Sequence, residues 1–134
     1  MRRRYSLLAF SLAVSWSSFL LLGASHRPPL SQVPAHEAAR VNPYAGQQTA
    51  VQAGAKLYQR ECAACHGAQA TGTRRAPALV SPILHHAPPG AVFWVLRNGS
   101  LRHGMPSFAH LPEARRWQII TYLETLRPAH VARS

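Results

Sequence analysis

The chain has 134 residues, 47% of them hydrophobic, so a single globular domain is the first expectation. It carries 15 Lys and Arg against four Glu and no Asp, a formal net charge of +11, and 14 of the 15 basic residues are arginine. Two cysteines exclude a disulfide-dense scaffold and a four-cysteine zinc or iron–sulfur site, and four carboxylates are too few for a calcium cage.

The first 25 residues have the pattern of an export signal. Three arginines follow Met1, residues 5–24 are apolar and free of charge, and residues 23–25 are small enough for a cleavage site. The apolar stretch is also about as long as the ~20 residues that span a bilayer. We therefore predict a signal peptide or an uncleaved N-terminal membrane anchor in 1–25, with the rest periplasmic or on the outer face of the cytoplasmic membrane.

Export changes the interpretation of the basic charge. Residues 26–134 keep 12 basic and four acidic side chains, a net charge of +8, and the basic residues are scattered rather than clustered. Nucleic acid is not an expected partner outside the cytoplasm. A cationic surface instead favours steering toward partners with acidic docking surfaces.

Residues 26–48 are rich in proline and show neither helical nor strand periodicity, so we expect a linker. The remaining residues, 49–134, predict short helices joined by long loops. The first helix is expected from Thr49, in a Thr-x-x-Gln capping box, to Glu61. Its Gly54 is an unfavourable interior residue that indicates close approach by another helix.

Two further helices follow in the sequence. One is expected over residues 91–97, with Asn98 and Gly99 as its stop. The other follows Pro112 and covers residues 113–126, with an apolar stripe that includes Ile119, Ile120 and Leu123. Loops are expected over residues 67–90 and 100–111, and no segment predicts a convincing strand.

The chemistry of the chain centres on the sequence Cys-Ala-Ala-Cys-His at residues 62–66. Cys-x-x-Cys-His is the attachment motif of c-type haem. On a helical turn Cys62, Cys65 and His66 share one face, so both thiols can bond one macrocycle while the imidazole binds its iron.

Three other interpretations of the two cysteines are weaker. A thioredoxin-like redox site is expected after a strand, and here the motif follows a helix. A zinc site usually needs a second pair of ligands. A disulfide between Cys62 and Cys65 would close a very short loop and stabilise little.

The motif also predicts a second axial ligand farther along the chain. Met105 is the only methionine besides Met1, and it lies in a Gly-Met-Pro sequence within a predicted loop. We predict that His66 and Met105 are the two iron ligands. Four histidines compete with Met105 for this role: His85, His86, His103 and His110. His103 is the most serious competitor, because it is two residues from Met105.

With these motifs in order, residues 49–134 resemble a bacterial class I (monohaem) cytochrome c. Gly54 and Tyr58 stand where that family keeps a glycine and an aromatic residue on its N-terminal helix, and Ile119, Tyr122 and Leu123 stand where its C-terminal helix crosses. The resemblance implies a small all-α fold of short helices and loops around one haem, with its N- and C-terminal helices crossing.

The resemblance also implies roles for two residues after the haem motif. Ala-Pro-Ala-Leu at residues 76–79 resembles the family's Pro-x-Leu segment. By this resemblance, the carbonyl of Pro77 would accept a hydrogen bond from the proximal histidine, and Leu79 would pack on the haem ring. Arg74, Arg75 and Arg97 are candidates to pair with the haem propionates.

Taken together, the sequence predicts an exported electron-transfer protein, not an enzyme, with one haem c bound through two thioethers. Its partners would be respiratory or dehydrogenase proteins. Two alternatives remain open: a haem-binding subunit of an oxidoreductase complex, and a haem enzyme or gas sensor in which Met105 is not a stable ligand.

Overall fold

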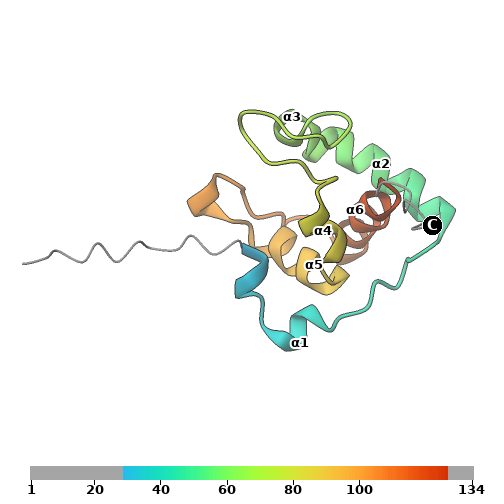
Figure 1. Cartoon of the computed structure of the whole chain (residues 1–134). Coiled ribbons are helices and arrows are strands. Elements are labelled where there is room, and N and C mark those ends of the chain that lie inside the picture. Colours follow the sequence, from blue (N-terminus) through green and yellow to red (C-terminus); the bar gives the residue numbers. More distant parts are fainter. Residues whose placement is uncertain (1–28, 127–134) are drawn as a thin grey trace, which may run out of the picture.

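The structure, a computed structural model, describes residues 29–126, in which every regular element is a helix. Its only β-type pairing in this range is an isolated bridge between Ser100 and Met105. In chain order the elements are η1 (Pro29–Gln32), α1 (Ala35–Ala38), α2 (Gln48–Glu61), α3 (Ala63–His66), α4 (Pro82–His86), α5 (Pro89–Asn98), η2 (Leu101–His103) and α6 (Glu113–Thr125). The predicted all-α fold is confirmed (Figure 1).

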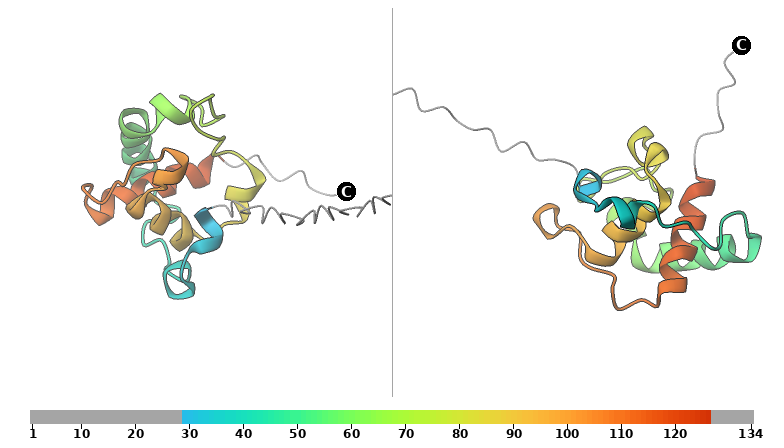
Figure 2. Two further views of the ribbon diagram at one scale, coloured as in Figure 1. Left: turned by 90° about the vertical axis from the view of Figure 1, so that its left-hand side faces the viewer. Right: turned by 90° about the horizontal axis from the view of Figure 1, so that it is seen from below.

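Helices α2 and α6 form the central helix pair of the fold. The two helices cross in Figure 2, where the red α6 runs over the green α2. At the crossing Gly54 lies so close to α6 that an added Cβ would overlap the carbonyl oxygen of Gln118 and come within 2.9 Å of the Cβ of Tyr122. The close approach predicted from Gly54 is confirmed, and it explains a glycine inside a helix.

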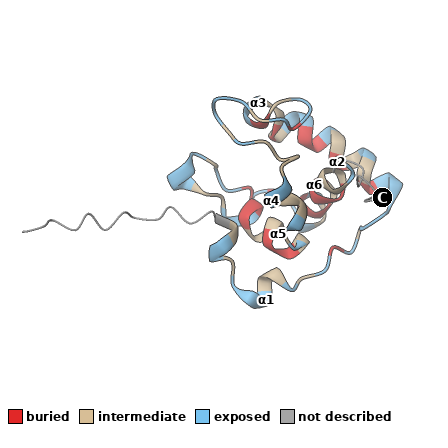
Figure 3. Cartoon of the chain, viewed as in Figure 1, coloured by how far each residue is buried: buried red, intermediate tan, exposed pale blue. Residues whose placement is uncertain are grey.

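The core lies between α2, α5 and α6, as the buried inner faces in Figure 3 show. The rings of Phe93 and Trp117 stack with their centroids 4.2 Å apart. Tyr58 is fully buried, and its hydroxyl donates to the carbonyl of Gly67, 2.7 Å away. The largest fully buried side chains are Trp117, Tyr58, Phe93, Ile119, Ile120 and Thr121.

The helices differ from the prediction mainly at their starts and within the predicted loops, where α4 and η2 form. Helix α2 begins at Gln48, and no side chain caps its N-terminus, so the capping box at Thr49 is wrong. Helix α5 begins two residues early, at Pro89, because proline suits a first helical turn. Helix α4 lies within a predicted loop and begins at Pro82, for the same reason.

The N-terminal segment differs from the structureless linker expected over residues 26–48. From residue 29 onward it forms η1 and α1, which both pack against α5. Side-chain contacts with α5 and α6 explain the difference, since a segment without its own periodicity is ordered here by distant partners. The predicted signal or anchor in 1–25 lies outside the described residues, within which no helix is both long and apolar enough to cross a membrane.

Candidate functional site

The sequence at residues 62–66 folds as a tight helical turn directly after α2. Cys62 ends α2 and precedes α3, and its carbonyl accepts hydrogen bonds from the backbone amides of Cys65 and His66 at 3.1 and 2.9 Å. Cys62 and His66 are buried, Cys65 is exposed, and neither thiol forms a disulfide. The predicted helical turn is confirmed.

A cavity of about 330 Å³ opens beside this turn. Both cysteines, His66 and Met105 line it, together with mostly apolar side chains. The apolar lining comes from segments that are far apart in the sequence: Leu30, Pro77, Leu79, Leu84, Val92, Val95, Leu96, Pro106, Phe108, Ile119 and Leu123. The cavity thus brings together the two cysteines, the two predicted iron ligands and the predicted Pro77 and Leu79.

The orientation of His66 is fixed by the loop that follows it. Its Nδ1 lies 2.8 Å from the carbonyl oxygen of Pro77, and because a carbonyl only accepts hydrogen bonds, Nδ1 carries the proton. The other ring nitrogen, Nε2, therefore keeps its lone pair and can bind a metal. Leu79, two residues after Pro77, lines the same cavity.

Met105 reaches the cavity from a loop that is held at both ends. Its backbone pairs with that of Ser100 through hydrogen bonds of 2.8 and 3.1 Å, and the amide of Phe108 donates to the carbonyl of Leu96 at 3.0 Å. Gly99, with φ of +74°, packs against the backbone of residues 105–107. These contacts fix the backbone of the loop that carries Met105, whose half-buried side chain lines the cavity and packs against the core.

The competing histidines occupy different surroundings. His103 also lines the cavity, and its Nδ1 lies 2.7 Å from the hydroxyl of Ser100. His86 and His110 are exposed. His85 lies outside the cavity, in a small separate pocket that it shares with Glu124. Only His103 therefore competes with Met105 on position.

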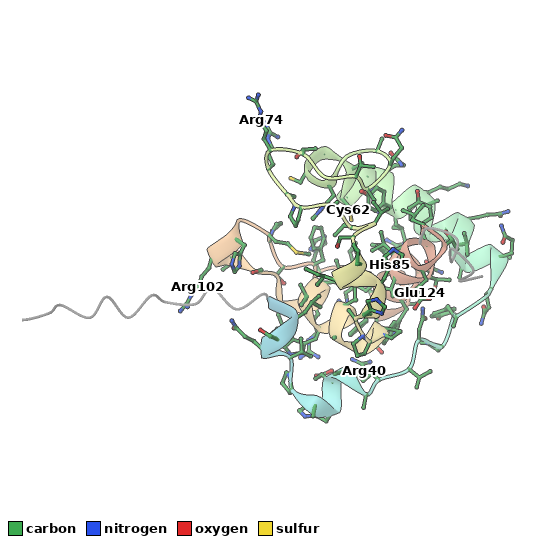
Figure 4. The ribbon with its side chains drawn as sticks, viewed as in Figure 1. Arg40, Cys62, Arg74, His85, Arg102 and Glu124 are labelled. Carbon is green, nitrogen blue, oxygen red and sulfur yellow. The ribbon has the colours of Figure 1, made fainter. Side chains whose placement is uncertain are left out.

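The three arginines that are candidates to pair with the haem propionates lie in different surroundings. Arg75 lines the cavity. Arg97 lies 3.6 Å from Glu37 and pairs with it. Arg74 is exposed and points away from the body of the molecule in Figure 4.

The state of Cys62 argues against a dithiol redox site. Burial, and to a smaller extent the charges of Glu61 and Cys65, raises the pKa of the Cys62 thiol to about 12. Redox-active cysteines need an accessible thiolate at neutral pH. Among residues 29–126, moreover, no three His, Cys, Asp or Glu side chains are placed to hold a metal ion.

The residues of the cavity do fit a covalently attached haem. They supply two thiols on one turn, an imidazole whose Nε2 is available, a thioether and an apolar wall. Sequence reasoning missed Leu30, which reaches the cavity from the segment expected to be a linker. No motif or periodicity around Leu30 would have identified it.

Comparisons with known proteins agree with this geometry. Residues 49–123 match the family described as cytochrome C oxidase, cbb3-type, subunit III. Among solved structures the chain resembles cytochrome cL from the marine methylotrophic bacterium Methylophaga aminisulfidivorans, with 24% identity and a TM-score of 0.57 over 63% of this chain. The match spans only 58% of that cytochrome's chain, so it supports the fold alone. No curated protein matches the chain.

Proposed function

The chain belongs to the family described as cytochrome C oxidase, cbb3-type, subunit III, and is therefore a c-type cytochrome; we propose that it is an exported carrier of single electrons between redox proteins. When bound, the haem supplies one-electron chemistry by cycling between Fe(III) and Fe(II). The chain's own residues hold the group, exclude water from it and set its potential. This role requires no substrate site, so we propose no enzymatic activity.

Each predicted site residue has a role in this proposal. Cys62 and Cys65 would form the two thioethers, and His66 and Met105 would bind the iron. The carbonyl of Pro77 orients the His66 ring, and Leu79 would pack against the haem. The observation that carries the proposal is the hydrogen bond from His66 Nδ1 to Pro77, because it leaves Nε2 for iron in a cavity that Met105 also lines.

Covalent attachment is the first expected result. After expression with a haem-ligation system, the wild-type band on a denaturing gel should stain for haem, and acid–acetone should extract none. The variant carrying Cys62→Ser and Cys65→Ser should give an unstained band. Haem that leaves the wild-type protein in acid–acetone would show that the two thiols do not hold it, and would contradict the proposal.

The second expected result concerns the partner. Because the chain carries a strong excess of basic side chains, we propose that its redox partners present acidic docking surfaces. Salt screens such long-range attraction. The bimolecular rate of electron transfer should therefore fall several-fold between low and physiological ionic strength in stopped-flow measurements, whereas a rate independent of salt would exclude steering by charge.

We further propose that residues 1–25 direct the chain to the periplasm or, if uncut, attach it through residues 5–24 to the outer face of the cytoplasmic membrane. The family description, which names an oxidase subunit, favours a second candidate, a haem subunit fixed in an oxidoreductase complex. Reduced-minus-oxidised spectra of membrane and soluble fractions, with the mass of the mature chain, separate these outcomes. A soluble, shortened cytochrome supports a free shuttle, and a membrane-bound one of full mass supports the anchored form.

A further inference from the structure

We propose that residues 29–44, here called the N-terminal strap, form a wall of the haem cavity, and that Leu30 on this strap is a haem-contact residue that limits the access of water to the ring. The inference rests on the proposed function, because it assigns a role toward the same haem. It adds a residue and a segment that lie outside the matched residues 49–123.

The position of Leu30 is the first observation. Leu30 is half-buried and lines the same cavity as Cys62, His66 and Met105. It stands in η1, which packs against α5, and the blue η1 lies beside the body of the domain in Figure 1. Leu30 is thus the point at which the strap meets the cavity, and it is the one residue of the strap in the cavity lining.

Ion pairs fasten the middle of the strap to α5 and α6. Glu37 lies 3.5 Å from Arg40 and 3.6 Å from Arg97, which belongs to α5. Arg40 in turn pairs with Glu113 at the start of α6, and its guanidinium lies 4.3 Å from the centre of the Phe93 ring. Arg40 is labelled beneath α5 in Figure 4. This cation–π contact attaches Arg40 to an aromatic ring of the core as well as to a glutamate.

A buried hydrogen-bond network fastens the end of the strap. Asn42 is 4% exposed, and its amide nitrogen donates to Thr121 at 3.0 Å and to Glu124 at 3.3 Å, both on α6. Its side-chain oxygen accepts from the backbone amide of Tyr44 at 3.0 Å. Three of the four glutamates in a strongly basic chain, all but Glu61, therefore contact the strap or form part of it.

A glycine on α5 makes room for the strap backbone. A Cβ at Gly90 would overlap the carbonyl oxygen of Glu37 and lie 2.8 Å from the carbonyl oxygens of Ala38 and Arg40. These contacts are with backbone atoms, which cannot turn aside as a side chain can. Gly90→Ala should therefore displace the strap while leaving α5, whose helical backbone accepts alanine, in place.

The expected effect on the haem follows from solvent access. Water stabilises the oxidised state, which carries one more positive charge, so a more exposed ring has a lower reduction potential. Leu30→Ala should lower the midpoint potential and should speed reduction by a small reagent such as ascorbate several-fold. Val41→Ala is the matched control, because Val41 lies on the same strap, is 82% exposed and does not line the cavity.

The decisive experiment combines the two substitutions in the full chain with haem attached. We would measure the midpoint potential, the rate of reduction by ascorbate and the hydrogen exchange of the amides of residues 35–44 in Leu30→Ala, Gly90→Ala, the double variant and Val41→Ala. If the strap acts through Leu30, Gly90→Ala should speed exchange in the strap and lower the potential, and adding Leu30→Ala should change the potential little more.

Two results would overturn the proposal. One is a Leu30→Ala variant with the potential and reduction rate of Val41→Ala. The other is a Gly90→Ala variant whose strap amides exchange rapidly while its potential stays that of the wild type. Absence of covalent haem from the wild-type chain would instead refute the proposed function, and the strap's attachment would still be measured by hydrogen exchange in the haem-free protein.

Discussion

Replacing Met105 with alanine is expected to lower the reduction potential sharply and to open the iron to added ligands. A thioether opposite an imidazole raises the potential of haem iron, so its loss removes that contribution. The weak sulfur-to-iron band near the red edge of the ferric spectrum should disappear, and carbon monoxide or azide should now bind. Spectroelectrochemical titration and difference spectra measure these changes.

His103→Ala is the matched control, because His103 lines the same cavity two residues away. It should leave the spectrum and the potential close to those of the wild type. An unchanged Met105→Ala spectrum with a changed His103→Ala spectrum would reverse the assignment and favour the enzyme or sensor alternative.

The features that the sequence predicted well are those encoded locally. The spacing of Cys62, Cys65 and His66 required a helical turn, and the structure has one. An interior glycine at residue 54 required a close partner, and α6 supplies it. Met105 could be singled out because the chain offers only one internal methionine, and the cavity includes it.

The features that the sequence missed depend on tertiary partners. Residues 29–44 carry no helical periodicity, and their order comes from Arg97, Thr121 and Glu113, far along the chain. Arg97 was a candidate to pair with a haem propionate, because a lone arginine in the sequence does not reveal that the half-buried Glu37 on another segment will pair with it. The capping box at Thr49 was wrong because Gln48 had already begun the helix.

Arg116 has a structural role that no sequence pattern indicates. Arg116 is 7% exposed, and its guanidinium donates to the carbonyls of Phe108 and Ala109 at 3.3 and 3.1 Å and to that of Leu111. Burial, together with the charges of Arg97 and Arg40, holds the pKa of the guanidinium below its ordinary value. Arg116 thereby ties α6 to the loop that carries Met105, so the helix crossing and the proposed ligand loop belong to one packed unit.

Because of this coupling, we expect a substitution at the crossing of α2 and α6 to have a large effect on stability. Gly54→Ala should gain about 1 kcal/mol of helix propensity, yet its Cβ would overlap the backbone carbonyl of Gln118 and press on Tyr122. Overpacking against rigid backbone costs about 1–3 kcal/mol and occasionally more, and here the contact is with a carbonyl group that α6 itself fixes. We therefore expect a net loss of about 2 kcal/mol in the free energy of unfolding, or roughly 10 °C in Tm for a domain of this size.

Denaturant and thermal unfolding of the haem-bound chain measure this loss. Gln52→Ala is the control, because Gln52 is exposed on the same helix and should change stability by no more than about 0.5 kcal/mol. The ferric red-edge band should weaken in Gly54→Ala as well, since a shift of α6 is passed through Arg116 to the loop of Met105. A Gly54→Ala variant more stable than the wild type would mean that helix propensity alone decides at this position, and that α2 and α6 do not meet there.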